Sequence, residues 1–194
     1  MPGELVVGCY TLGDYAEVAK DHLLKSVNAL GLPYIIQEIP DRGFWVLNNS
    51  ACQLFLRSME SEWPEDDFLY VDVDGEVHSD PWPFLRTLRG KCDVAAYLLD
   101  GKELLSGTLY LPAGPNRIRL LNQWIARNEE NPGRWDQKNL QTLIGENPEF
   151  RFARLPAEYC CIFDLQRKRT PDIVPVIEHF QASRKFKDGT WAPR

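Results

Sequence analysis

The chain has 194 residues, a formal net charge of −6, and a composition that is 44% hydrophobic and 26% charged. This balance is typical of one globular domain with a sizeable core, and the negative charge argues against nonspecific binding to nucleic acid. Five cysteines without C-x-x-C spacing, no hydrophobic segment of membrane-spanning length and no signal-peptide pattern together predict a cytoplasmic protein with reduced thiols.

The first part of the chain alternates between strand and helix patterns. Hydrophobic runs and hydrophobic residues at helical spacing predict, in order, a strand, a helix, a strand, a helix and a strand over residues 5–10, 15–30, 33–39, 44–58 and 68–71. Gly31 supplies a stop signal for the first helix, because glycine readily adopts the backbone conformation that ends a helix. This alternation is typical of a largely parallel sheet.

The second part of the chain is expected to extend this sheet. The predicted strands cover residues 93–98, 104–111, 150–155 and 160–165. An Asp-Gly turn between the first two favours an antiparallel pair. Pro115 can open a helix, and Asp136 can serve as the N-cap of another. The residues after 165 are expected to be loop-like. The prediction is a single α/β domain with a mixed, mostly parallel sheet flanked by helices.

Two aspartates, Asp72 and Asp74, follow the third strand directly and are themselves followed by Gly75. Open α/β sheets bind ligands at the carboxyl ends of their strands, so we expect both carboxylates on the ligand side of the sheet. Carboxylates this close repel each other unless a cation or a proton lies between them. Hard divalent ions such as Mg²⁺ or Mn²⁺ prefer such oxygen ligands. The simplest alternative is a solvent-exposed strand end at which Asp74 and Gly75 turn the chain.

Two other aspartate motifs have related spacing. A helix-loop-helix calcium site counted from Asp72 would need glycine at its sixth position and glutamate at its twelfth, where this chain has Val77 and Pro83. Phosphatases of the haloacid dehalogenase type, which this segment also resembles, use the first Asp as nucleophile and the second as acid/base. Their motif usually follows the first strand and needs a downstream acidic pair, whereas here it follows the third strand. A phosphatase with Asp72 as nucleophile stays an alternative.

Four further segments accompany the two aspartates in an order that matches one family. They are Leu5–Thr11, Ser106–Tyr110, Trp135–Gln137 and Pro175–Phe180. With these segments, nearly the whole chain resembles metal-dependent glycosyltransferases of the GT-A type, in particular glycogenin-like and galactosyltransferase-like enzymes. The resemblance implies a single GT-A-like, Rossmann-like domain in which Asp72 and Asp74 form the D-x-D motif of the family.

The resemblance implies a binding site for a sugar nucleotide. Tyr10 and Thr11, at the end of the first strand, would contact the nucleotide. Ser106 and Gly107, in a later strand that begins with small residues, would form the floor of the donor sugar pocket. A UDP-sugar is the expected donor, and Mn²⁺ or Mg²⁺ is the expected cofactor.

The resemblance also implies how the metal and the diphosphate would be held. A histidine in the last segment completes the metal site in the family, and here that residue is His179. A cation held by Asp72, Asp74 and His179 would neutralise the charge that develops on the leaving diphosphate. Arg184 and Lys185 follow closely and would bind the phosphates, with arginine offering two parallel hydrogen bonds. The K-P-W sequence that glycogenin-like enzymes usually carry near this histidine is absent.

The implied activity is transfer of a sugar from the nucleotide donor to a hydroxyl group. Asp136 and Gln137 would be the catalytic residues that face the sugar, and this pair favours retention of the anomeric configuration. The acceptor stays open among a glycan, a small molecule, a protein and a modified base in DNA. On this interpretation residues 1–166 form the nucleotide-sugar-binding domain, and the basic segment 167–194 completes the metal and diphosphate site. A catalytically silent module that binds nucleotide sugars is a further alternative.

Overall fold

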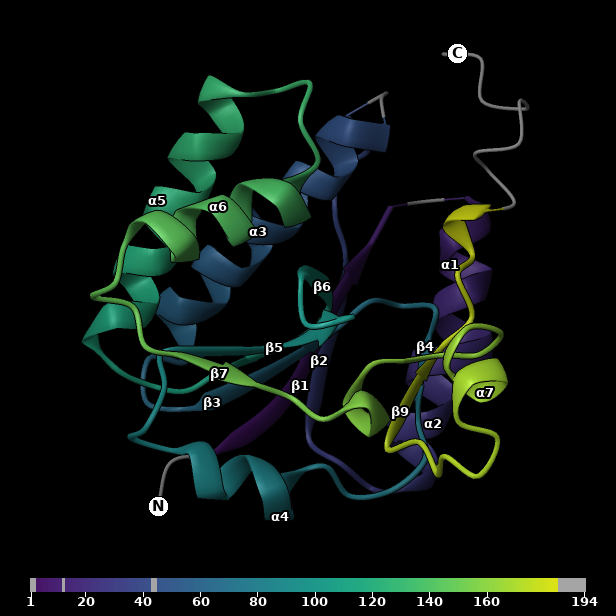
Figure 1. Cartoon of the computed structure of the whole chain (residues 1–194). Coiled ribbons are helices and arrows are strands. Elements are labelled where there is room, and N and C mark those ends of the chain that lie inside the picture. The colour runs from purple at the N-terminus through teal and green to yellow at the C-terminus, as the bar shows by residue number, and fades with distance from the viewer. Residues whose placement is uncertain (1–2, 12, 43–44, 185–194) are drawn as a thin grey trace.

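The computed structural model describes residues 3–11, 13–42 and 45–184, and its centre is a six-stranded sheet with helices on both faces (Figure 1). The strands are β1 (Glu4–Tyr10), β2 (Tyr34–Glu38), β3 (Asp67–Val71), β5 (Val94–Leu99), β6 (Glu103–Leu111) and β7 (Phe152–Arg154). Their order in the sheet is β2-β1-β3-β6-β5-β7. β6 is antiparallel to its neighbours β3 and β5, while the pairs β1–β2, β1–β3 and β5–β7 are parallel. The mixed, mostly parallel sheet expected from the sequence is confirmed.

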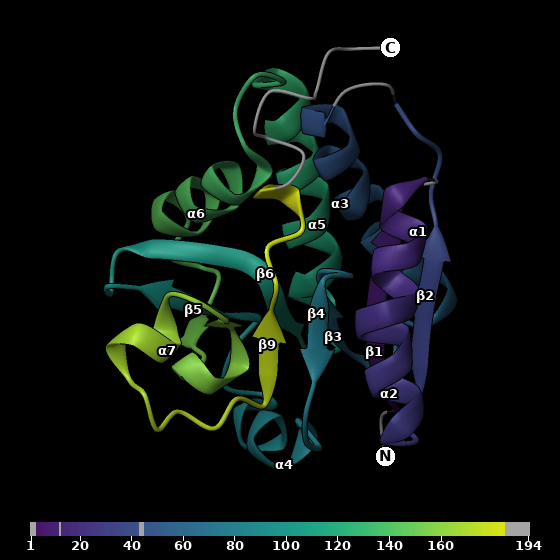
Figure 2. The same cartoon turned by 90° about the vertical axis from the view of Figure 1, so that its right-hand side faces the viewer.

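Helices cover both faces of this sheet (Figures 1 and 2). One face carries α3 (Trp45–Glu62), α5 (Pro115–Glu130) and α6 (Asp136–Glu146), and the other carries the first helix of the chain. The shorter helical segments are α4 (Trp82–Leu85), η2 (Arg86–Leu88), η3 (Ala157–Tyr159) and α7 (Gln166–Arg169). No helix in the described ranges has both the length and the hydrophobicity needed to cross a membrane.

Neighbouring strand residues point to opposite faces of the sheet, which gives the protein two hydrophobic cores. Phe68 and Tyr70 of β3 pack on the side of α3, α5 and α6. Leu69 and Val71 pack on the side of the first helix, and all four side chains are buried. Because both faces are covered, β3 is hydrophobic along its length and holds the residues that follow it at a fixed position.

The first helix runs from Asp14 to Ala29 and includes one π-helical stretch. Its parts are α1 (Asp14–Ala19), η1 (Lys20–Leu24) and α2 (Lys25–Ala29). The predicted stop is confirmed at Gly31, whose φ of 62° lies in the left-handed region that favours glycine. The Leu32 N–H then donates to the Val27 carbonyl (3.0 Å), which closes the last turn. The π-helical stretch could not be predicted, because hydrophobic spacing does not distinguish it from an α-helix.

The β5–β6 hairpin places small residues beside the aspartates. Asp100 and Gly101 have φ values of 54° and 68°, the left-handed conformation that tight hairpin turns favour, and the Lys102 N–H closes the turn on the Leu99 carbonyl (3.0 Å). The antiparallel pair expected from the sequence is therefore confirmed. β6 then runs along β3, with Thr108 opposite Val71. Gly107 thus lies directly beside the end of β3.

A second, smaller sheet lies against the first helix (Figure 2). It contains β4 (Gly75–Val77), β9 (Ile177–His179) and β8 (Cys161–Ile162), in that order. β4 and β9 are antiparallel, so Gly75 lies opposite His179. The expectation of loop-like structure after residue 165 is wrong, because α7 and β9 fall there. The strand expected over 160–165 is reduced to the two residues of β8. Segments this short carry too little periodicity to be recognised in a sequence.

Candidate active site

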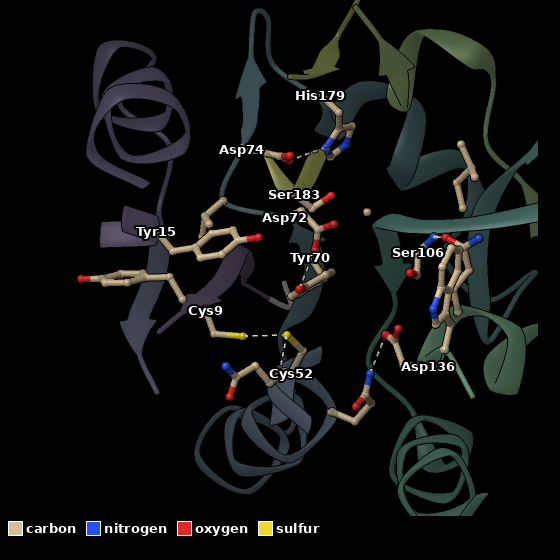
Figure 3. A pocket seen from close by; sticks show the side chains of 18 of the residues that line it. Cys9, Tyr15, Cys52, Tyr70, Asp72, Asp74, Ser106, Asp136, His179 and Ser183 are labelled. Carbon is tan, nitrogen blue, oxygen red and sulfur yellow. Dashed lines mark hydrogen bonds and ion pairs between the residues drawn. The ribbon is translucent and has the colours of Figure 1, made fainter. Parts of the chain in front are cut away.

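A cavity of about 330 Å³ opens at the carboxyl ends of β1 and β3 (Figure 3). Nine residues selected from the sequence line it: Tyr10, Thr11, Asp72, Asp74, Ser106, Gly107, Asp136, Gln137 and His179. They come from β1 and the residue after it, from β6, α6 and β9, and from the turn after β3. Figure 3 shows Asp74 beside His179, and Asp136 on another wall of the cavity. Residues far apart in the chain therefore meet at the side of the sheet where α/β proteins bind ligands.

Asp72 is held at its backbone and at one carboxylate oxygen. Its N–H donates to the Gly107 carbonyl (2.8 Å), and the Tyr70 hydroxyl donates to Asp72 Oδ1 (2.8 Å). The side chain is otherwise exposed to the cavity. The enclosing walls displace bulk water and, together with the charge of Asp74, raise the pKa of Asp72 to about 6. This carboxyl is therefore poised to exchange a proton for another cation near neutral pH.

Asp74 is more closely bound by the protein than Asp72. Its Oδ2 accepts a hydrogen bond from the Ala182 N–H (2.8 Å), and its Oδ1 lies 3.4 Å from His179 Nδ1. Burial alone would raise the pKa of Asp74, but the interactions with His179 and Ala182 lower it. Asp74 is therefore a fixed negative charge at the edge of the cavity.

His179 reaches the cavity because β9 pairs with β4, the strand that follows the aspartates. The ring is buried, and its Nε2 forms a hydrogen bond with the Thr108 hydroxyl (2.8 Å). Burial disfavours the charged ring, but the influence of Cys160 and Asp74 raises the pKa of His179 overall. The imidazole is thus oriented from both nitrogens before any ligand binds.

Gly107 lets these groups converge. A Cβ atom at this position would lie 3.1 Å from Asp72 Oδ2 and 3.3 Å from His179 Cε1. Both distances are shorter than ordinary van der Waals contact, so a side chain here would push the two groups apart. The small residue expected at the floor of the pocket therefore has a clear steric reason.

Asp72, Asp74 and His179 border one cavity but do not form a closed ligand set. Within residues 3–11, 13–42 and 45–184, no three His, Cys, Asp or Glu side chains are arranged to hold a metal ion. The donor types suit a divalent cation, since carboxylate oxygens and an imidazole nitrogen are common ligands of Mn²⁺ and related ions. Ligation by His179 would require its ring to exchange a contact with Thr108 or Asp74.

Asp136 opens α6 and reaches into the cavity. The expectation that it is the N-cap is wrong by one residue, because Trp135 has the extended backbone of a cap (ψ 134°) and Asp136 is already helical. Asp136 Oδ2 accepts a hydrogen bond from Gln53 Nε2 (3.0 Å). Burial raises the pKa of Asp136 to about 7, against the opposing effect of its hydrogen bonds.

Gln137 is fixed by two neighbours. Its Oε1 accepts a hydrogen bond from the Ser106 N–H (3.2 Å), and its Nε2 donates to Glu103 Oε1 (3.2 Å). Glu103 also accepts a hydrogen bond from Lys138 (2.9 Å). Both polar ends of Gln137 are engaged, so contact with a bound sugar would require it to exchange one of these partners.

Of the two basic residues expected at the diphosphate, the structure describes Arg184 alone. Arg184 donates to Asp164 (2.6 Å) and is absent from the described lining of the cavity. Lys185 lies outside the described residues. Ser183, which was not selected from the sequence, does line the cavity. Phosphate binding by Arg184 would therefore require it to leave Asp164, and this role stays a prediction.

Several lining residues were missed in the sequence. They include Cys9, Cys52, Gln53, Tyr70 and Ser183. The Cys9 and Cys52 sulfurs lie 3.2 Å apart as free thiols, and their hydrogen bond together with burial raises the pKa of Cys9. Tyr70 could have been found, because it precedes Asp72 by two strand positions and must share its face. Cys52 and Gln53 lie on α3, and only the tertiary fold brings them here.

No protein-family model and no curated protein matches the sequence, whereas solved structures match the fold. A glycosyltransferase involved in the glycosylation of the major capsid of PBCV-1 superposes with a TM-score of 0.74 at 13% identity, over 93% of this chain and 94% of that one. The glycosyltransferase GlyE of Streptococcus pneumoniae TIGR4 gives a TM-score of 0.60 at 18% identity. This match covers all of the present chain and 58% of GlyE.

The galactosyltransferase LgtC, in complex with donor and acceptor sugar analogues, gives a TM-score of 0.53 at 14% identity, over 91% of this chain and 87% of that one. The chain has the fold of these glycosyltransferases. Identities of 13–18% support a common fold and do not by themselves carry over an activity. The activity must be argued from the cavity.

Proposed function

We propose that this protein is a metal-dependent glycosyltransferase that moves a sugar from a nucleotide-diphosphate donor, with UDP-sugars as first candidates, to a hydroxyl acceptor. The observation that carries the proposal is the cavity itself, which joins Asp72, Asp74 and His179 to Asp136 and Gln137. A diphosphate needs positive charge, and a sugar needs hydrogen-bond acceptors. In this proposal the carboxylates and the imidazole of the cavity would bind the cation, and its carboxylates would also accept hydrogen bonds from hydroxyl groups. The fold shared with glycosyltransferases supports the same reading.

Five of the cavity residues have a defined task in this proposal. A Mn²⁺ or Mg²⁺ ion held by Asp72, Asp74 and His179 would supply Lewis-acid stabilisation of the leaving diphosphate. Gly107, where a Cβ would press on Asp72 and His179, would let these two groups converge on the ion. Asp136 accepts hydrogen bonds from sugar hydroxyls once it is ionised, which its pKa of about 7 allows at and above neutral pH. Retention of configuration is the proposed stereochemical outcome.

The phosphatase alternative is not favoured. It needs a downstream acidic pair beside Asp72, and the other acids of the cavity besides Asp74 are Glu103 and Asp136 among the described residues. Glu103 is bound by Gln137 and Lys138, and Asp136 is bound by Gln53. Glu103 lies on β6 and Asp136 on α6, and the two acids accept hydrogen bonds from different residues. Their arrangement supports sugar binding better than completion of a phosphatase metal site.

A ligand screen by thermal unfolding tests the proposal. UDP, UDP-glucose, UDP-galactose and the corresponding GDP- and ADP-sugars would each be added with Mn²⁺ and with EDTA. Metal-linked binding should raise the unfolding temperature by mass action for at least one nucleotide. Asp72→Asn should lose this rise and keep the fold, whereas the matched variant Asp172→Asn, at an exposed acid outside the cavity, should keep both.

Two outcomes would contradict the proposal. One is the absence of a metal-dependent rise with every nucleotide diphosphate tested. The other is a covalent phosphoryl or BeF₃⁻ adduct at Asp72, which belongs to the phosphatase mechanism. A positive screen would be followed by transfer assays in which glycan, protein, small-molecule and DNA acceptors are separate arms, with the anomeric product read by NMR.

A further inference from the structure

A row of buried amide side chains ends on Asp136. Asn139 Nδ2 donates to Asn128 Oδ1 (2.8 Å), and Asn128 Nδ2 donates to Gln53 Oε1 (3.1 Å). Gln53 Nε2 then donates to Asp136 Oδ2 (3.0 Å). The exposed fraction is 0% for Gln53 and Asn139 and 5% for Asn128. The row joins α3, α5 and α6, and one of its ends opens into the cavity.

The direction of these hydrogen bonds is set by the carboxylate. An ionised Asp136 can only accept, so Gln53 must turn its amide nitrogen toward it. The Gln53 carbonyl then faces Asn128, which must donate in turn. The Asn128 carbonyl oxygen in turn faces Asn139, which must donate to it. All three amides are therefore oriented by what Asp136 requires.

The row is not arranged for maximum stability. Asn139 Oδ1, at the closed end, is buried and has no hydrogen-bond partner among the described residues. A buried acceptor without a partner is unfavourable. Apolar side chains of similar volume would fill this space between the helices without that cost. The arrangement is therefore better explained by its effect on the open end than by packing.

The backbone of Asp136 is held as well as its side chain. Trp124 Nε1, on α5, donates to the Asp136 carbonyl oxygen (3.0 Å). With Gln53 on α3 bound to Oδ2, the residue is fixed from two helices at once. The carboxyl also accepts hydrogen bonds from the backbone N–H groups of Gln137 and of Asp136 itself, and the side chain lines the cavity.

We propose that Gln53 is a positioning residue that holds Asp136 as an oriented acceptor for a hydroxyl of the donor sugar, with Asn128 and Asn139 fixing the orientation of its amide. This inference rests on the proposed sugar transfer for its biological meaning. The hydrogen-bonded row itself does not depend on that activity. Gln53 acts through Asp136 and needs no contact with the sugar.

Electrostatics supports this role. Burial raises the pKa of Asp136, and the charge of Asp72 on the turn after β3 raises it further. The backbone N–H of Gln137 and the side-chain amide of Gln53 both oppose this rise, the Gln137 N–H more strongly. The ionisable side chains that share the cavity are Asp72, Asp74, Glu103, His179, Tyr10, Tyr15, Tyr70, Cys9, Cys52 and Cys160. Removal of the Gln53 donor should leave Asp136 protonated over a wider pH range, and a protonated carboxyl is a weaker acceptor.

The test compares Gln53→Leu with Gln166→Leu. Gln166 is also buried and also makes two hydrogen bonds, to the Ile162 N–H and the Cys160 carbonyl, but it does not contact Asp136. The Asp136 carboxyl would be titrated by carbon NMR in the full chain labelled at aspartate, with Asp136→Asn assigning the signal. Gln53→Leu should move the midpoint up by about one pH unit, the size expected for loss of a charged hydrogen bond. Gln166→Leu should leave it unchanged.

An unchanged midpoint in Gln53→Leu, or an equal change in Gln166→Leu, would overturn the proposal. If Gln53→Leu does not fold, Gln53→Met keeps a similar volume and carries the same expectation. Transfer assays then separate the two proposals. A midpoint that moves in a protein without transfer activity supports the positioning role and contradicts the transferase. Transfer activity in the wild type, with an unchanged Asp136 titration midpoint in Gln53→Leu, supports the transferase and contradicts the positioning role.

Discussion

The two ends of β3 carry acidic residues under opposite conditions. At the amino end, Asp67 is 1% exposed and accepts hydrogen bonds from Arg89, the Tyr110 hydroxyl and the Ala113 N–H. At the carboxyl end, Asp72 accepts one from Tyr70 and otherwise faces the cavity. The protein satisfies the first carboxylate completely and leaves the second available. The difference separates a group that stabilises the fold from one that is available to bind.

Near the amino end of β3, the buried Arg117 is a second charged group whose hydrogen bonds are all made within the protein. Its guanidinium donates to Glu60 and to the carbonyls of Asp66 and Leu111, among others, and lies over the Phe68 ring, 3.9 Å from its centroid. Such saturation is what a buried charge needs to be tolerated. The cavity lacks it, and proteins commonly lose some stability at sites kept open for ligands.

The largest expected effect is the loss of stability when Arg117, near the amino end of β3, is replaced. Arg117→Met should lower the free energy of unfolding by about 3–5 kcal/mol, because Glu60 and several carbonyls lose their buried partner. Urea unfolding measures this. Arg119→Met, on the same helix, removes an exposed ion pair with Glu149 and should cost at most about 1 kcal/mol. Equal losses of stability in the two variants would contradict the interpretation that the buried hydrogen bonds of Arg117 stabilise the fold.

The next prediction compares an acid after the carboxyl end of β3, where activity should fall, with Asp67 at the amino end, where stability should fall. Asp74→Asn should lower sugar transfer by about 100- to 1,000-fold, the range seen when one charge-stabilising group is removed. The fold should survive, since the side chain lies at the cavity. Asp67→Asn should show the opposite pattern, with a lower unfolding midpoint and unchanged nucleotide binding per folded molecule. Loss of nucleotide binding in folded Asp67→Asn would count against the comparison.

The open end should have its own pH signature. Folding raises the pKa of Asp136 from 3.8 to about 7, so its contribution to stability is fully present below pH 3.8 and is lost as the pH rises through 7. Asp136→Asn removes this loss and should raise the free energy of unfolding at pH 8 by about 1–3 kcal/mol relative to the wild type. Urea unfolding at pH 4 and pH 8 measures it. At pH 4 the two proteins should differ little.

A smaller effect tests the steric design of the cavity floor. Gly107→Ala should weaken metal-linked nucleotide binding about tenfold, because the new methyl group presses on Asp72 and His179. Titration calorimetry with UDP and Mn²⁺ measures the change. Gly145→Ala is the matched control, since a Cβ on that glycine of α6 meets no atom within 4 Å. It should leave binding intact and stabilise the helix slightly.

The smallest effect concerns Glu178, a buried acid that an arginine binds, as Arg89 binds Asp67. Glu178, on β9, binds Arg167 (2.6 Å), and this contact together with His78 lowers its pKa below the ordinary value of 4.5. Its contribution is therefore present above pH 4.5 and is lost as the pH falls through the lower folded pKa. Thermal unfolding of Glu178→Gln should show a deficit at pH 7 that disappears in strong acid. A deficit that grows on acidification would reverse the assignment.

The sequence predicts the main sheet well because its strands are long enough to show a hydrophobic pattern. The Asp-Gly turn and the stop at Gly31 are local features, and both are confirmed. The small sheet is different, since β4, β8 and β9 have two or three residues each and are held by pairing across the chain. Their strand conformation comes from tertiary contacts that no local pattern records.

The candidate site divides in the same way. Asp72 and Asp74 are visible in the sequence, because a hydrophobic run leads directly to them. His179 and Asp136 enter only through resemblance to a family. Gln53 has no local signal, because its role depends on how α3, α5 and α6 pack. The prediction for Arg184 rests on its charge and on its closeness to His179 in the sequence, and neither reveals that Asp164 is within hydrogen-bonding distance.

The position of β9 in the chain has a consequence for biosynthesis. All six strands of the main sheet precede residue 155, whereas β9 begins at Ile177. Strands β1, β2, β3, β5 and β6 all end by Leu111, so a growing chain can pair these five strands, and with them position Asp72 and Asp74, before His179 has been synthesised. Domains commonly begin to fold during translation, amino-terminal parts first. The nascent protein can thus pass through a stage in which most of the sheet is formed but the wall of the cavity that contains His179 is missing.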